Sequence, residues 1–224
     1  YEHNPDVCSI ERARELHGED VATNYDLIQH CNQHAVHMLN GYVDFLEHAL
    51  QVPLKIQTNK PMVYLSEQEK GWMNQVAEAT GREQKFWIVC AGRKKDFTAK
   101  FWGTENYQKV VDMLRGRVLF VQVGSLEHHH PPLKNVVNLL GKTDLRQLVR
   151  LTHHSEGVLC GITMMHHLAA ALDKPSVSLL GGREPVQWNS YPRSLLLHTG
   201  GALPGCLKHT GGKLGEACWR SRTV

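Results

Sequence analysis

The chain lacks the features that would place it in a membrane, in an export route or on a nucleic acid. No apolar run among its 224 residues approaches the ~20 residues that a membrane span needs, and the amino end carries no signal-peptide pattern. The net charge of +3 is too small to indicate a surface for nucleic acid or lipid. The composition, 42% hydrophobic and 21% charged, is typical of a soluble globular protein of one large domain or two small ones.

The six cysteines lack the spacing of a disulfide framework. They are scattered along the chain, and Cys90 and Cys160 fall in runs that we expect to be buried strands. This pattern favours reduced thiols and a cytoplasmic location. Histidine, by contrast, is abundant: fifteen residues predict a net charge that rises steeply below pH ~6.5.

The most informative stretch is a strand-helix-strand pattern in the last third of the chain. Two apolar runs, 158–160 and 177–180, enclose a helix-forming segment, and glycine follows each run. This is the sequence pattern of a βαβ unit. Because ligands of open parallel sheets gather outside the carboxyl ends of the strands, we expect part of a site at Gly161, Thr163 and the 181–184 loop.

The same alternation of strands and helices extends back to residue 84. Strands that alternate with helices of about ten residues argue for a doubly wound parallel sheet with right-handed crossovers. We therefore predict an α/β fold, with residues 84–224 forming one Rossmann-like domain. Its earlier strands are expected over 86–91, 118–123 and 136–140, and its earlier helices after Thr104 and Thr143.

Residues 1–83 are predicted to form a separate and mostly helical unit. Apolar residues recur at three- and four-residue spacing over 25–50, which indicates a helix. A short strand is predicted over 62–65. The following segment, 66–69, has the form of a capping box and should begin a helix that ends at Gly81.

Two loops after predicted strands carry side chains suited to ligand binding. The loop after 86–91 holds four cations, including Lys100, which would suit a diphosphate, although a solvated basic loop has the same composition. The loop after 118–123 holds Glu127 and three consecutive histidines, 128–130. Adjacent side chains point in different directions, so we favour a hydrogen-bonding role for Glu127 or one histidine over a metal site.

These motifs resemble those of glycosyltransferase family 9, in the same order and spacing. The family contains the ADP-heptose transferases of lipopolysaccharide and protein glycosylation. The resemblance implies the GT-B architecture, in which two Rossmann-like domains face each other across a cleft and the carboxyl-terminal one holds the nucleotide sugar. The resemblance covers 86–224 well and 1–85 loosely. The motifs that carry it are Gly92 with Lys100-Phe101-Trp102, Gly124 with the histidines and Pro131, Leu139–Thr143, Gly157–Ala171, and Gly181–Pro185 with Trp188.

The resemblance also implies which residues bind the donor. Lys100 matches a lysine that contacts the diphosphate, and Thr163 with the amides that open its helix matches the segment that meets the phosphates. His167 matches the histidine of a His-Leu-Ala-Ala-Ala run, for which helix packing is the alternative role. The predicted donor-binding set is Gly92, Lys100, Glu127, Gly161, Thr163, Met164, His167, Gly181, Gly182 and Arg183.

The chemistry implied by the resemblance is inverting transfer without a metal or other cofactor. A base deprotonates an acceptor hydroxyl while cations stabilise the departing diphosphate. The family's base is an aspartate early in the amino-terminal domain, which has no match here, so the catalytic residue is left unassigned. The predicted partners are a nucleotide-sugar donor, which the resemblance implies is ADP-linked, and a glycan or protein acceptor. A homo-oligomer is left open.

A structural metal in the carboxyl-terminal tail is a minor alternative. Tetrahedral zinc or iron needs about four ligands. Cys206, His209 and Cys218 supply three, so two reduced thiols are the preferred interpretation.

Two other functions compete with a glycosyltransferase. The first is a non-catalytic module that binds a nucleotide sugar and works with a partner chain. The second is a Rossmann-like oxidoreductase, which is disfavoured because no G-x-G-x-x-G motif opens a helix.

Overall fold

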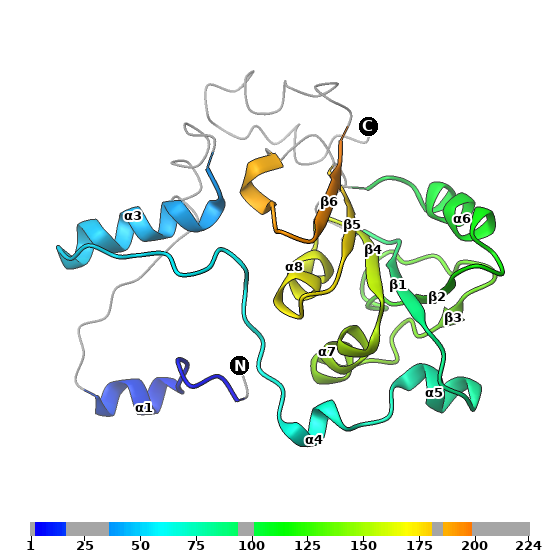
Figure 1. Ribbon diagram of the computed structural model, residues 1–224, viewed down its shortest axis with the longest axis horizontal. Helices are drawn as coiled ribbons and strands as arrows, with labels where there is room; N and C mark the ends of the chain where they lie inside the picture. The colour runs from blue at the N-terminus through cyan, green and yellow to red at the C-terminus, as the bar shows by residue number, and fades with distance from the viewer. Residues whose placement is uncertain (1–2, 17–35, 94–100, 181–185, 199–224) are drawn as a thin grey trace.

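A computed structural model describes residues 3–16, 36–93, 101–180 and 186–198 of the chain (Figure 1). Its centre is a six-stranded sheet in which every neighbouring pair of strands is parallel. The strand order is β3-β2-β1-β4-β5-β6. The strands are β1 (Phe86–Cys90), β2 (Leu119–Gln122), β3 (Val137–Asn138), β4 (Gly157–Gly161), β5 (Ser176–Leu179) and β6 (Ser194–Leu197).

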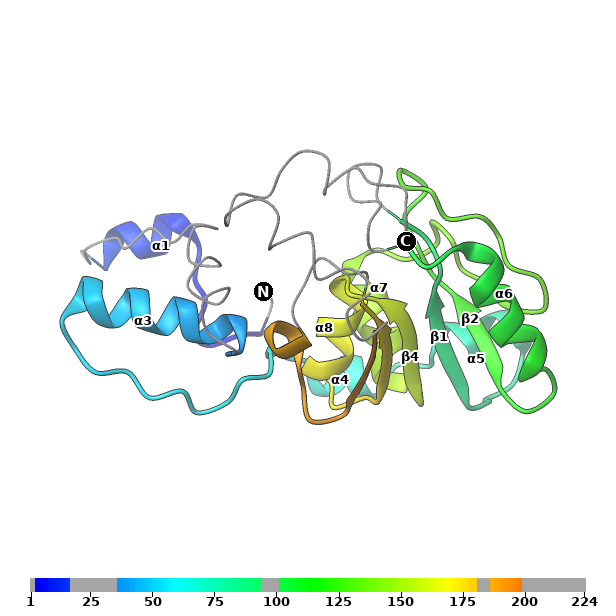
Figure 2. The ribbon, with the colours of Figure 1, turned by 90° about the horizontal axis from the view of Figure 1, so that it is seen from above.

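Helices between the strands cover both faces of this sheet. Helix α6 (Thr104–Met113) joins β1 to β2 on one face, whereas α7 (Leu145–His154) and α8 (Met164–Ala171) lie on the other (Figures 1 and 2). The 3₁₀ helix η2 (Val186–Asn189) lies between β5 and β6. The α/β fold with a doubly wound parallel sheet, predicted from the sequence, is therefore confirmed.

The central strands are apolar throughout because both of their faces are buried. In β1, Phe86 and Ile88 join the core under α7 and α8, whereas Val89 joins the core under α6. In β4, Val158 and Leu159 divide in the same way between the two cores. A strand covered on both sides appears in the sequence as a continuous apolar run, which is why these strands could be predicted.

The chain reverses its direction across the sheet between β1 and β4. It passes outward from β1 through β2 to β3, and then returns to place β4 along the other side of β1, with Ile88 beside Val158. From β4 the sheet extends the opposite way through β5 and β6. Such a reversal leaves a crevice at the carboxyl ends of the two central strands, where open α/β sheets bind their ligands.

The structure differs from the sequence prediction in two strands. Strand β6, a four-residue run at the edge of the sheet, was not predicted. The strand predicted over 62–65 is wrong, because this segment belongs to no sheet. Val63 and Leu65 pack against the core, so the apolar run reflects partial burial without a neighbouring strand.

The helix predicted after Ser66 is divided into α4 (Glu67–Lys70) and α5 (Gln75–Thr80). The predicted capping box is confirmed. The Ser66 hydroxyl accepts from the Glu69 amide at 3.2 Å, and the Glu69 carboxylate accepts from the Ser66 amide at 2.8 Å. Asn74 caps α5 in a similar way, and this second helix start divides the segment.

Among the described residues, two helices precede these. Helix α1 (Ile10–Glu15) was not predicted, and α3 (Met38–Leu50) lies within the helix predicted over 25–50, part of which lies outside the described residues. Helix α3 lies beside η2, and the ring centroids of His37 and Tyr191 are 5.4 Å apart. No helix in the described ranges is long and apolar enough to cross a membrane.

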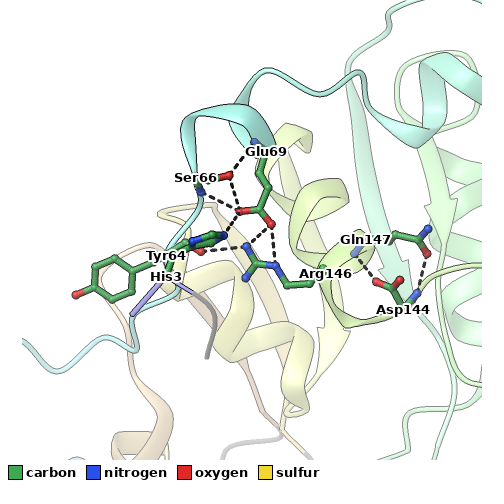
Figure 3. Close-up of polar contacts among 7 residues, drawn as sticks. All are labelled: His3, Tyr64, Ser66, Glu69, Asp144, Arg146 and Gln147. Carbon is green, nitrogen blue, oxygen red and sulfur yellow. Dashed lines mark hydrogen bonds and ion pairs between the residues drawn. The ribbon is translucent and has the colours of Figure 1, made fainter. Parts of the chain in front are cut away.

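A buried ion pair joins the segment before the sheet to α7 (Figure 3). Glu69 is only 5% exposed, and its carboxylate accepts hydrogen bonds from Arg146 Nε, at 2.8 Å, and from Arg146 Nη2. Arg146 also donates to the Tyr64 carbonyl at 3.2 Å, and His3 Nε2 lies 3.4 Å from the same carboxylate. The hydrogen bonds from Arg146 lower the pKa of Glu69 to about 2.

We expect Arg146→Ala to lower the free energy of unfolding by about 2–3 kcal/mol, because it leaves the buried Glu69 carboxylate without its cation. Unfolding curves in urea measure this loss. Since the folded-state pKa of Glu69 lies below its ordinary 4.5, its contribution in the wild type should be complete above that pH and should disappear as the pH falls toward 2.

Arg12→Ala is a matched control, since it removes an exposed ion pair with Glu15 within α1. Its expected cost is below ~1 kcal/mol. Equal losses in the two variants would show that the pair between Glu69 and Arg146 has no special role.

Candidate functional site

The carboxyl ends of β1 and β4 bring together four residues of the predicted donor-binding set. The two strands pair in register as far as Cys90 beside Cys160, so the residues that follow leave the sheet next to one another. Gly92 comes from the β1 side, and Gly161, Thr163 and Met164 come from the β4 side, where α8 begins. This is the reversal point of the sheet, and it includes Gly161 and Thr163, two of the positions at which the sequence predicted part of a site.

The start of α8 is suited to an anionic group. Thr163 occupies the N-cap position with an extended backbone, but its side chain makes no capping hydrogen bond. Its Oγ1 atom is buried next to the Cys160 thiol, with which it interacts, but it makes no well-formed hydrogen bond within the described part of the chain. A hydroxyl in this state, at the positive end of a helix dipole, could bind a phosphate oxygen.

The triple-histidine loop folds back over the ends of β1 and β2. The His130 ring lies so close to Gly92 and Gly124 that a Cβ atom on either glycine would overlap it. Two backbone hydrogen bonds tie the loop to the end of β1. The Arg93 amide donates to the His129 carbonyl at 2.9 Å, and the His129 amide donates to the Arg93 carbonyl at 3.1 Å.

Glu127 lies in the same loop with an exposed side chain, one strand away from the β1–β4 crevice. The base of this loop is held by Gln122, which is fully buried in β2. Its side-chain amide donates to the Pro131 carbonyl and its Oε1 accepts from the Leu133 amide, both at 2.8 Å. Gln122 was not among the residues predicted from the sequence, although a lone amide inside an apolar strand is a signal for such a role.

The two adjacent histidines of α8 have different surroundings. His166 is fully buried, with Nδ1 2.8 Å from the Ser178 hydroxyl and Nε2 2.8 Å from the Asn189 carbonyl. His167, the predicted site residue, is half-buried, and its Nδ1 lies 2.8 Å from the Tyr191 hydroxyl. His166 therefore links α8 to β5 and η2, a role that the sequence analysis did not assign.

The other predicted residues lie outside the described ranges. In the ranges that are described, no group of three or more His, Cys, Asp and Glu side chains could hold a metal ion. The predicted residues outside these ranges are Lys100, Gly181, Gly182 and Arg183 in the donor-binding set, and Cys206, His209 and Cys218 in the tail.

A hollow of about 470 Å³ lies on another part of the surface, between α7 and the segment that contains α5. The guanidinium of Arg150 covers the Trp72 ring there, 5.6 Å from its centroid. None of the predicted donor-binding residues lines this hollow. It is therefore separate from the crevice at the ends of β1 and β4.

The sheet order, the crossover helices and the glycines at the reversal point define a Rossmann-like α/β domain. The family model of glycosyltransferase family 9 (heptosyltransferase) matches residues 17–200. The chain belongs to this family, as the resemblance in the sequence indicated. The comparison with curated proteins found no match.

Solved structures of the family have the same fold. A glycosyl transferase of family 9 from Veillonella parvula aligns with 73% of this chain at 16% identity and a TM-score of 0.57. The ADP-heptose LPS heptosyltransferase II of E. coli aligns with 66% at 21% identity and a TM-score of 0.51. E. coli heptosyltransferase WaaC with ADP aligns with 72% at 17% identity and a TM-score of 0.50. The chain covers 49%, 48% and 50% of these three proteins, about half of each.

We expect His166→Ala to lower the free energy of unfolding by about 2–3 kcal/mol, because it leaves the buried Ser178 hydroxyl and Asn189 carbonyl without the ring. Urea unfolding measures the change. His48→Ala, at an exposed position in α3, is the control and should alter stability by less than ~0.5 kcal/mol. A His166→Ala protein as stable as the control would rule out this packing role.

Proposed function

We propose that this chain binds a nucleotide-diphosphate sugar at the carboxyl edge of β1 and β4, and that the protein transfers the sugar to an acceptor hydroxyl. Membership of glycosyltransferase family 9 supports the reaction class. The observation that carries the site is the meeting of Gly92, Gly161 and Thr163 at the reversal point, where the buried Thr163 hydroxyl marks the start of a helix.

The donor is proposed to be an ADP-linked, heptose-like sugar. Two solved structures with the same fold support this choice, since one is described as an ADP-heptose LPS heptosyltransferase and the other as a heptosyltransferase with ADP. The proposed acceptor is a glycan or protein hydroxyl, with the lipopolysaccharide core as the first to test. Cytoplasmic location and self-association stay predictions from the sequence.

Each proposed donor contact has a chemical reason. Thr163 and the first amides of α8 would bind phosphate oxygens, and Lys100 would neutralise the diphosphate. Gly92 and Gly161 would let the ligand approach the backbone closely. The remaining members of the set would contact the sugar, ribose or base, and they are Glu127, Met164, His167, Gly181, Gly182 and Arg183.

The proposed reaction is a single displacement that inverts the anomeric carbon and needs no metal. A base removes the acceptor proton as the acceptor oxygen attacks, and the bond from the anomeric carbon to the diphosphate breaks. Cations stabilise the charge that builds on the departing diphosphate. Of the early aspartates Asp6, Asp20 and Asp26, only Asp6 lies in the described ranges. It is exposed and follows no strand, so the base stays unassigned.

Calorimetric titration of the 224-residue chain with ADP, UDP and GDP tests the donor site. We expect saturable binding of ADP, and Lys100→Ala should weaken it by about 1–3 kcal/mol through loss of a charge-assisted contact. Lys85→Ala is the matched control, because Lys85 is 86% exposed and precedes β1 at the opposite edge of the sheet. The Lys85→Ala variant should bind ADP with the same affinity as the wild type.

Transfer is measured separately, as release of ADP from ADP-heptose in the presence of a lipopolysaccharide-core acceptor. Release of ADP only when the acceptor is present supports the proposed transferase activity. ADP binding without release, with or without acceptor, favours the alternative of a binding module that needs a partner chain. A folded sample that binds none of the three nucleotides overturns the proposed function.

A further inference from the structure

Five polar groups follow one another through the interior, from the start of α8 to η2. The Cys160 thiol, in β4, lies 3.6 Å from the Ser178 hydroxyl, in β5, and this hydroxyl lies 2.8 Å from His166 Nδ1. The other ring nitrogen of His166 lies 2.8 Å from the Asn189 carbonyl. At the opposite end, the Cys160 thiol interacts with the Thr163 hydroxyl. We call these five groups the polar row, and the side chains of its three middle members are fully buried.

The Asn189 carbonyl determines the direction of the hydrogen bonds along the polar row, because a carbonyl oxygen only accepts. His166 therefore carries a hydrogen on Nε2. A second hydrogen on Nδ1 would place a charge in the interior, so Nδ1 of the neutral ring accepts from the Ser178 hydroxyl. The Ser178 oxygen then accepts from the Cys160 thiol. The only thiol hydrogen is thus engaged, and the sulfur can only accept from Thr163.

Cys160 is a neutral thiol, as this arrangement requires. Burial raises its pKa to about 12, although the Ser178 and Thr163 hydroxyls act in the opposite direction. A thiol sulfur is a weak acceptor. In agreement, Thr163 Oγ1 is buried but makes no well-formed hydrogen bond among the described residues. The contact between Thr163 and the sulfur is therefore weaker than the hydrogen bonds of Ser178 and His166.

This weak contact lies where a phosphate is proposed to bind. Thr163 is the N-cap residue of α8, at the reversal point of the sheet. A phosphate oxygen is a charged acceptor, and a charge-assisted hydrogen bond is roughly twice as strong as a neutral one. Rotation of the hydroxyl from the sulfur to a phosphate oxygen would therefore gain more than it loses.

We propose that Cys160 is a positioning residue of the donor site, whose sulfur accepts the Thr163 hydrogen in the empty protein and yields it to a phosphate oxygen of a nucleoside diphosphate. The rest of the polar row fixes this role, since a thiol whose hydrogen is held by Ser178 cannot donate to Thr163. The inference rests on the proposed function. It adds a residue that lies in the interior, behind the residues proposed to contact the donor.

Calorimetric titration of Cys160→Ala with ADP tests this role. The variant should bind ADP about fivefold more tightly than the wild type, because the phosphate no longer competes with the sulfur for the hydrogen. It should also unfold at lower urea concentration, since the buried hydroxyl loses its partner in the empty protein. Tighter binding is a result that a purely structural role would not produce.

Two variants serve as controls for this titration. Cys90→Ala removes a buried thiol that is in register with Cys160 on the neighbouring strand but outside the polar row. It should bind ADP within about twofold of the wild type. Cys160→Ser keeps a donor and an acceptor in the row, so it should bind ADP no more tightly than the wild type.

A double-mutant cycle shows whether Cys160 acts through the hydroxyl. Thr163→Val removes the hydroxyl with little change in shape and should weaken ADP binding about tenfold. In this background, Cys160→Ala should change the affinity by less than about twofold, because no hydrogen is left to compete for. Equal effects of Cys160→Ala with and without the hydroxyl would show that it acts through packing, and would overturn the inference.

Infrared spectroscopy of the nucleotide-free chain tests the direction of the hydrogen bonds. The S–H stretching band of Cys160 is isolated as the difference between the wild type and Cys160→Ser. Hydrogen bonding lowers the frequency of this band, so Ser178→Ala should move it. A band that Ser178→Ala leaves in place would show that the thiol does not donate to Ser178, and would remove the basis of the inference.

Failure of the inference can be told apart from failure of the proposed function. If the wild type binds ADP but Cys160→Ala binds it no more tightly than Cys90→Ala does, the donor site stands and the positioning role is overturned. If the folded wild type binds no ADP, the proposed function fails and the positioning role fails with it.

Discussion

Burial of β1 on both faces is the constraint on which the rest of the structure depends. Its side chains alternate between two cores, so helices must cover both sides of the sheet: α6 on one, α7 and α8 on the other. Helices on both faces require crossovers in both directions from β1, and the reversal between β1 and β4 follows. The crevice at the carboxyl ends of these two strands is thus a consequence of how the core is covered.

Buried polar groups in the interior of this fold have more hydrogen-bond partners than those near the carboxyl ends of the strands. In the interior, the polar atoms of the Gln122 and His166 side chains have hydrogen-bond partners within the fold. At the edge, Thr163 Oγ1 and His130 Nδ1 are buried and make no well-formed hydrogen bond among the described residues, although the Thr163 hydroxyl interacts with the Cys160 thiol. Buried polar atoms without partners are uncommon in proteins. One of these atoms follows β4 and the other belongs to the loop against Gly92 and Gly124, so both lie at the edge of the sheet where a ligand is proposed to bind.

The segment before the sheet is attached by polar contacts as well as by apolar packing. Val76, in α5, joins the core under α7. The ion pair between Glu69 and Arg146 holds the start of α7. Because α7 and α8 share that core, the attachment also supports the helix that opens at Thr163. The unit predicted for residues 1–83 and the Rossmann-like sheet thus meet at a buried, charge-assisted contact.

The sequence by itself determined the elements whose signals are local: the central strands from their continuous apolar runs, the capping box at Ser66, and the glycines at the carboxyl ends of β1 and β4. Only the tertiary structure decided what depends on contacts between distant segments. It made 194–197 a strand, β6, and left 62–65 outside any sheet, because a strand forms only where a neighbouring strand pairs with it. It selected His166 over His167 for the interior, since one of two adjacent helical residues must face the sheet. It also seated His130 against glycines 6 and 38 positions earlier, a match that register and packing alone create.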